Sequence, residues 1–174
     1  MTKKMSWCLA LALLSTAGVR AAAATPKPSW DCLRFLVGSW TGDSTGPDQG
    51  AGYFRFEPRQ NGRVLLRTNH AEYPAQGSQP ASLHDDLMVV EPAAKGLKAT
   101  FVDSEGNVIL YDSIECTDKP AAVVFLSSAV TARPRFRLSY KQLEGGRLEG
   151  LFEIAQPDAP FSPYKRWVAK PKAL

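Results

Sequence analysis

The stretch that decides the fold reads Phe35-Leu36-Val37-Gly38-Ser39-Trp40-Thr41-Gly42. Just before and within it, Trp30, Leu33, Leu36 and Val37 recur at helical spacing, which predicts one or two helical turns. After it, short segments with alternating apolar and polar residues are separated by turn residues, and no helix-length pattern follows. The stretch therefore marks the point where a short N-terminal helical cap gives way to strands.

The strand pattern extends to the end of the chain. Asn61-Gly62, Gly145-Gly146 and similar turn signals join neighbouring segments as hairpins. Successive strands joined in this way lie side by side, and closing such a sheet removes its exposed edges. We expect an all-β, ten-stranded antiparallel up-and-down barrel. The predicted strands are 39–44, 52–57, 63–73, 83–91, 97–103, 108–116, 121–129, 135–143, 147–155 and 164–169.

The first residues have the features of a secretory leader. Lys3 and Lys4 precede a short apolar segment, 7–17, and small residues follow up to Ala24. The segment is too short to span a bilayer, and no later segment is long and apolar enough. We predict a signal peptide over 1–24, a linker and helical cap over 25–34, and one barrel domain over 35–174. The protein is then exported to the periplasm or the extracellular space.

Charge argues against nucleic-acid binding. Loss of the leader removes Lys3, Lys4 and Arg20, and the net charge falls from +4 to +1. No concentrated basic stripe remains, so the main requirement for nucleic-acid binding is missing.

Two cysteines, Cys32 and Cys116, remain after removal of the leader. An even number of cysteines in an exported protein favours a disulfide, which would tie the cap to the end of a mid-chain strand. Two free buried thiols are the alternative.

Polar residues are concentrated in the strand 67–73, and the next strand begins near His84. These neighbouring strands hold both histidines of the protein, so Arg67, His70, Glu72 and His84 are candidates for a polar ligand site. A hydrogen-bonded, solvated rim is the alternative. The spacing of the histidines and carboxylates does not predict a metal site. No catalytic motif is present, so the sequence predicts a protein that is not an enzyme; a hydrolase or isomerase using the two histidines stays an alternative.

Two strands are apolar on both faces, at 87–90 and at 123–126. A small barrel has one interior and a mostly hydrated exterior, so these strands need additional cover. The N-terminal segment or a second copy of the chain would provide it, and a homodimer is the hypothesis that follows from the second alternative.

Several motifs together resemble one known group of barrels. They are 35–42, 52–58, 62–65, 69–74, 84–88 and 136–140. In their order and spacing the chain is similar to secreted bacterial relatives of the nitrobindin and fatty-acid-binding branch of the calycin superfamily. The resemblance implies a ligand-enclosing barrel in which the Trp of Gly-x-Trp packs in the floor beneath a basic residue of the last strand. Gly38 and Trp40 match the motif, and Arg166 is the expected basic partner.

The resemblance also implies a function. By analogy with the fold, we expect a small, partly hydrophobic molecule in the interior, with aromatic walls and with Arg67, Arg137 or His70 meeting a carboxylate or phosphate head group; which side of each strand faces inward stays open. The expected ligand-binding residues here are Arg67, His70, His84, Tyr111, Arg137 and Tyr140.

The chain departs from nitrobindins at one position. Those proteins bind haem through a histidine near the C-terminus, whereas this chain has no histidine after His84. We therefore expect no cofactor. Haem held by a different ligand, for which Tyr164 or His70 is the candidate, and a barrel filled entirely by its own side chains are the alternatives.

Overall fold

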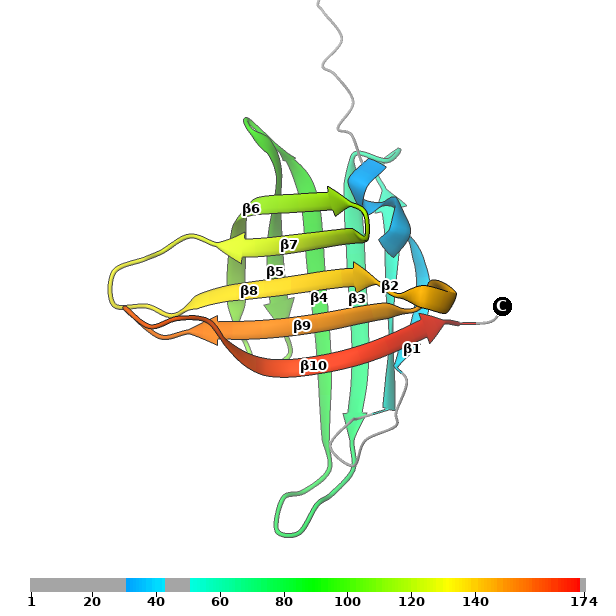
Figure 1. Cartoon of the computed structure of the whole chain (residues 1–174). Helices are drawn as coiled ribbons and strands as arrows, with labels where there is room; N and C mark the ends of the chain where they lie inside the picture. Colours follow the sequence, from blue (N-terminus) through cyan, green and yellow to red (C-terminus); the bar gives the residue numbers. More distant parts are fainter. Residues whose placement is uncertain (1–30, 43–50, 173–174) are drawn as a thin grey trace, which may run out of the picture.

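Ten strands form one closed antiparallel barrel in the computed structural model, which describes residues 31–42 and 51–172 (Figure 1). The predicted signal peptide and most of the predicted linker lie outside the described residues. Two short 3-10 helices accompany the strands, η1 (Asp31–Leu36) and η2 (Glu144–Gly146). The strands are β1 (Gly38–Gly42), β2 (Ala51–Arg59), β3 (Val64–Tyr73), β4 (Ser82–Ala93), β5 (Gly96–Asp103), β6 (Val108–Asp118), β7 (Ala121–Ser127), β8 (Arg135–Gln142), β9 (Leu148–Ala155) and β10 (Ser162–Pro171).

The barrel is an up-and-down meander. Each strand pairs with the next in the chain, and β1 pairs with β10 to close the sheet, with Trp40 opposite Pro171 and Gly42 opposite Ala169. The predicted fold class is therefore confirmed. One turn differs from expectation: Arg59 pairs with Val64, so the β2–β3 connection has four residues, not the two expected at Asn61-Gly62.

Side chains and η1 fill one end of the barrel. Leu33 and Leu36 of η1 are fully buried there. Trp40 is also buried; its Nε1 donates to the Leu36 carbonyl at 2.8 Å, and its ring stacks on Phe54. Gly38 allows the turn from η1 into β1, because its φ of 138° is one that residues with a side chain rarely adopt. We call this the closed end.

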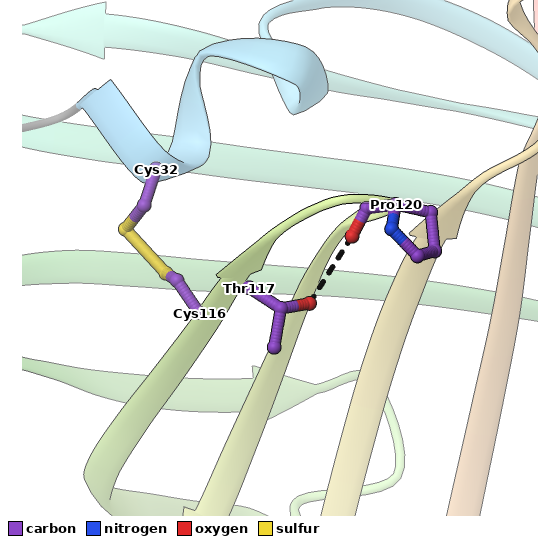
Figure 2. The surroundings of a disulfide bond; sticks show 4 residues. All are labelled: Cys32, Cys116, Thr117 and Pro120. Carbon is purple, nitrogen blue, oxygen red and sulfur yellow. Dashed lines mark hydrogen bonds between the residues drawn. A yellow bond between two sulfur atoms is a disulfide. The ribbon is translucent and has the colours of Figure 1, made fainter.

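A disulfide joins Cys32 in η1 to Cys116 in β6 (Figure 2). The two Cα atoms are 5.9 Å apart, within the usual range for a disulfide. The bond connects positions 84 residues apart in the chain. The predicted disulfide is thus confirmed, and it holds the helix that fills the closed end against the sheet.

The expected pairing of Trp40 with Arg166 is wrong. Along β10, Lys165 and Trp167 border the interior, so the alternation of a strand turns Arg166 to the outer face. There its guanidinium pairs with the Glu149 carboxylate at 2.6 Å, and the side chain is 55% exposed. The basic residue of the last strand therefore takes no part in closing the floor.

The outer face keeps several large apolar residues. Leu87, Val102 and Val108 lie opposite one another on β4, β5 and β6, and all three are exposed. The expected two-sided character of the strand at 87–90 thus appears as an exposed row. Within the described part of the chain, no helix has the length and apolar character needed to cross a membrane.

Candidate functional site

The other end of the barrel contains a cavity of about 810 Å³. It lies where β3, β5 and β9 end and β4, β6 and β10 begin, as shown by its lining residues Tyr73, Asp103, Ile154, Ser82 and Val108. We call this the open end. Most of the wall is apolar or aromatic, and it includes Phe54, Phe101, Ile109, Tyr111, Phe136, Leu138, Phe152, Ile154 and Trp167.

Two neighbouring strands divide the polar residues between the inside and the outside of the barrel. Along β3, Leu65 and Arg67 are buried in the interior, so His70 belongs to the opposite row. Along β4, Asp86, Met88 and their in-phase neighbour His84 face the interior. The expected convergence of Arg67, His70, Glu72 and His84 on one site is therefore wrong, because alternation separates them into two clusters.

The inner cluster centres on a buried ion pair between Arg67 and Asp86. Both side chains are nearly inaccessible to water, 6% and 4% exposed. A charge this deeply buried needs a partner of opposite charge, and the guanidinium and the carboxylate are each other's partner. The guanidinium also lies 5.6 Å from the ring centre of Phe54. Burial by itself lowers the pKa of Arg67, but nearby Tyr140 and Asp86 outweigh it, and the pKa is raised.

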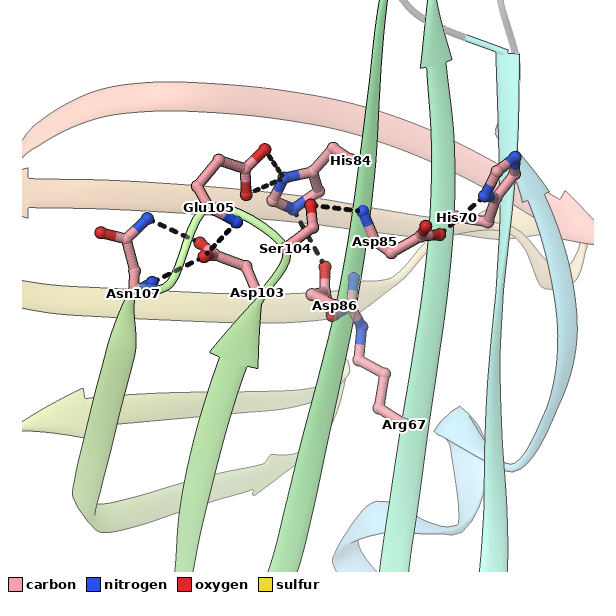
Figure 3. Close-up of polar contacts among 9 residues, drawn as sticks. All are labelled: Arg67, His70, His84, Asp85, Asp86, Asp103, Ser104, Glu105 and Asn107. Atoms are coloured by element: carbon pink, nitrogen blue, oxygen red, sulfur yellow. Dashed lines mark hydrogen bonds and ion pairs between the residues drawn. The ribbon is translucent and has the colours of Figure 1, made fainter.

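His84 joins this ion pair to the rim of the cavity. Its Nε2 is 3.3 Å from Asp86 Oδ2, and its Nδ1 is 3.0 Å from the Glu105 carboxylate. The hydrogen bond to Asp86 raises the pKa of His84 most, burial opposes it, and Glu105 adds to it, so the pKa reaches about 9. The imidazole is therefore protonated at neutral pH. Figure 3 shows Asp86 between Arg67 and His84, while Asp85 points toward His70.

His84, Asp103 and Glu105 are also the one group among the described residues whose donor atoms suit a metal ion, since these atoms lie within 4.8 Å of one another. The same atoms have protein partners. Asp103 accepts hydrogen bonds from the backbone and side-chain nitrogens of Asn107, and Glu105 pairs with His84. The donor atoms of this group are thus engaged in hydrogen bonds and ion pairs within the protein.

Two tyrosines lie at the inner end of the cavity. Tyr111 lines it, and Tyr140 packs behind Phe54 with ring centres 5.9 Å apart. Burial is the main reason that the pKa of Tyr140 is raised to about 12, and burial also raises the pKa of Tyr111. Both phenols are therefore neutral. The Tyr140 hydroxyl and Arg67 Nε are buried without a hydrogen-bond partner among the described residues.

The outer cluster consists of His70, Glu72 and Asp85. His70 and Glu72 were candidates for the polar ligand site. The His70 ring pairs with Asp85 at 2.7 Å and with Glu72 at 3.1 Å, and these contacts raise its pKa. His70 borders the mouth of the cavity, but its ring packs against the exposed Tyr53.

Arg137 is also on the outer face. It makes two hydrogen bonds to Glu153, at 2.5 and 2.7 Å, and lies over the Phe161 ring. Arg137, one of the expected ligand-binding residues, does not line the cavity, because it alternates with the inward-facing Phe136 and Leu138.

Asp86 is the residue that the sequence interpretation missed. Its position two residues before Met88 places it in phase with the apolar residues of β4. The sequence could have identified Asp86 from this position, because an acidic residue on the apolar face of a strand is buried and needs a cation as a partner.

The two histidines and the tyrosines Tyr111 and Tyr164 do not suit haem as iron ligands. An iron ligand needs a free donor facing the interior, and both nitrogens of His84 are engaged by carboxylates. The His70 ring lies outside the barrel. Tyr164 is 72% exposed at the rim. Tyr111 is a neutral phenol, whereas iron binds the phenolate.

These features define the class of protein: a closed ten-stranded antiparallel barrel with one filled end and a mostly apolar cavity at the other, consistent with a calycin-like fold. No protein-family model matches the chain, and no curated protein matches it at a significant level.

Proposed function

We propose that this protein is an exported, non-enzymatic barrel that binds a small, partly hydrophobic molecule in the cavity at its open end. The observation that carries the proposal is the cavity itself, about 810 Å³ with mainly apolar and aromatic walls. Small-molecule sites typically have about 300–1,000 Å³ of space, apolar walls and a few fixed polar groups. Both the volume and the lining support binding in preference to a barrel filled by its own side chains.

The state of the polar groups favours binding over catalysis. A general acid or base needs a proton-transferring group that is free to meet the substrate. Here Arg67, Asp86, His84 and Glu105 are engaged with one another in a chain of ion pairs. These residues therefore serve as a fixed polar lining in our proposal.

Export and membership of the calycin superfamily are part of the same proposal. The disulfide supports export, because such bonds persist in oxidising compartments. The meander topology and the buried Trp40 beneath η1 support the superfamily assignment. Mass spectrometry of the mature protein, isolated from its host, tests export; an N-terminus at Thr25 is expected.

Two adjacent residues of β6 provide the test of binding. Ile109 is buried and lines the cavity, whereas Leu110 is 57% exposed on the outer face. An uncharged environment-sensitive dye, Nile red, should bind the wild type with a blue-shifted emission. Ile109→Trp fills the cavity with a larger side chain, and we expect at least tenfold weaker dye binding. Leu110→Trp should bind like the wild type.

Circular dichroism and the thermal midpoint of each variant establish that both are folded. Failure of the folded wild type to bind the dye or any apolar compound would overturn the proposal. Equal binding by the two variants would place the dye on the surface and would contradict it as well.

The homodimer stays a prediction. It rests on the exposed apolar row formed by Leu87, Val102 and Val108. Light scattering coupled to gel filtration measures the mass directly, and a monomer at micromolar concentration would contradict it.

A further inference from the structure

Two of the cations that face the cavity have anionic partners. Arg67 pairs with Asp86, and His84 pairs with Asp86 and Glu105. The third cation of the lining, Lys165, has its ammonium 5.0 Å from the centre of the Tyr73 ring. The lining also contains three carboxylates, Asp86, Asp103 and Glu105, and His70 at the mouth of the cavity.

The pairing of Arg67 with Asp86 disfavours a charged head group at the inner end of the cavity. A carboxylate placed beside Arg67 would compete with Asp86 for the guanidinium, and it would leave one of the two carboxylates without this partner. Leaving a buried charge unpaired is costly in free energy. The same argument applies to an ammonium group, because Asp86 is committed to Arg67.

The inner end of the cavity nevertheless lacks a hydrogen-bond acceptor. Arg67 Nε is a donor only, is buried, and has no acceptor among the described residues. The Tyr140 hydroxyl, also buried and unpartnered, stays protonated at neutral pH. Buried donors are almost always paired in folded proteins, so Arg67 Nε, on a residue that lines the cavity, indicates an acceptor supplied from outside the chain.

We propose that the ligand is an uncharged amphiphile, with an apolar chain along the aromatic wall and a hydroxyl, carbonyl or ether oxygen that accepts a hydrogen bond at the Arg67 end of the cavity. This inference rests on the proposed function and names the chemical class of its ligand. The apolar part packs against residues such as Phe101, Phe136 and Phe152.

Three compounds of one chain length separate the head-group classes. 1-Dodecanol, dodecanoate and dodecylamine are used at pH 7 to displace Nile red from the mature wild-type protein. We expect dodecanol to displace the dye at a concentration at least tenfold lower than either charged compound. A preference for dodecanoate or for dodecylamine overturns the inference and leaves the binding function intact. Absence of binding by the dye and by all three compounds overturns the binding function itself.

Adjacent aspartates on β4 supply a matched pair of variants. Asp86 faces the cavity, whereas Asp85 pairs with His70 on the outer face. Asp86→Asn removes the carboxylate that neutralises Arg67, and dodecanoate should then bind at least tenfold more tightly than to the wild type. Asp85→Asn removes the same charge from the outer face and should leave the ranking of the compounds unchanged.

Circular dichroism shows whether Asp86→Asn retains the fold. Unchanged dodecanoate binding by folded Asp86→Asn contradicts the inference. If Asp86→Asn does not fold, the wild-type ranking of the three compounds still decides between the classes.

Discussion

Gly150 shows how closely single residues fit inside this barrel. It lies in β9 opposite Trp167 of β10, and a Cβ added at Gly150 would overlap the indole ring of Trp167. The indole in turn packs edge-on against Tyr140, with ring centres 5.8 Å apart. The absence of a side chain at Gly150 therefore allows two large aromatic residues to share the interior below the cavity.

We predict that Gly150→Ala lowers the free energy of unfolding by about 1–3 kcal/mol, because the indole must move within a packed interior. Gly42→Ala is the matched control, since its Cβ would make only an ordinary contact of 3.8 Å with the Gly52 carbonyl. Its effect should stay within about 0.5 kcal/mol. Urea unfolding measures both. Equal stability of Gly150→Ala and the wild type would contradict the packing described.

Single residues near the site were predictable only where the phase of their strand was known. Arg67 and His70 lie three positions apart, so they face opposite sides of β3. Their polarity alone does not reveal this difference. Arg166 was assigned to Trp40 by analogy, although its neighbours Lys165 and Trp167 border the interior. Asp86 could have been identified from its phase with Met88 and Val90.

At the scale of elements, the attachment of η1 to the sheet is the connection most open to experiment. The helix fills the closed end with Leu33 and Leu36, and the Cys32–Cys116 bond fixes it to β6. Strands β1 to β5 and most of β6 lie between the two cysteines in the sequence. The bond therefore restricts the unfolded chain over a long loop.

Replacing both cysteines, as Cys32→Ala with Cys116→Ala, should lower the free energy of unfolding by about 2–5 kcal/mol. The disulfide stabilises the folded protein mainly because it restricts the conformations of the unfolded chain. Urea unfolding with and without a reducing agent measures it. The wild type should lose stability when reduced, whereas the double variant should not respond; a wild type indifferent to reduction contradicts the prediction.

Strands were predicted more accurately than sites, and the reason is physical. The alternating pattern and the turn residues that mark a strand are local in sequence, as in β8, where Phe136, Leu138 and Tyr140 alternate with polar or charged residues. The cavity is not local, because its wall takes residues from strands at both ends of the chain. The volume of the cavity depends on how side chains from many strands pack together, and the sequence of one strand does not determine this packing.

For the molecule as a whole, the protonation of His84 couples pH to the stability of the barrel. Its pKa is about 9 in the folded protein against an ordinary value of 6.5. Below pH 6.5 both the folded and the unfolded states hold the proton, and the stabilisation is complete. As pH rises from 6.5 to 9 the unfolded state loses the proton first, so the stabilisation declines.

We predict that the free energy of unfolding falls by about 1–3 kcal/mol between pH 6.5 and pH 9 and that His84→Gln removes most of this dependence. His70→Gln is the comparison, because its pKa is also raised but its ring lies on the outer face. Urea unfolding at several pH values gives the slopes. A His84→Gln slope equal to that of the wild type would contradict the prediction.

The filled end has a consequence for the kinetics of ligand exchange. Because η1 and its leucines are packed at the closed end, residues 31–42 and 51–172 leave the cavity one opening, at the open end. A second molecule has no separate route in, so the first must leave before another enters. The rate of dissociation should accordingly be the same at every concentration of a competing compound.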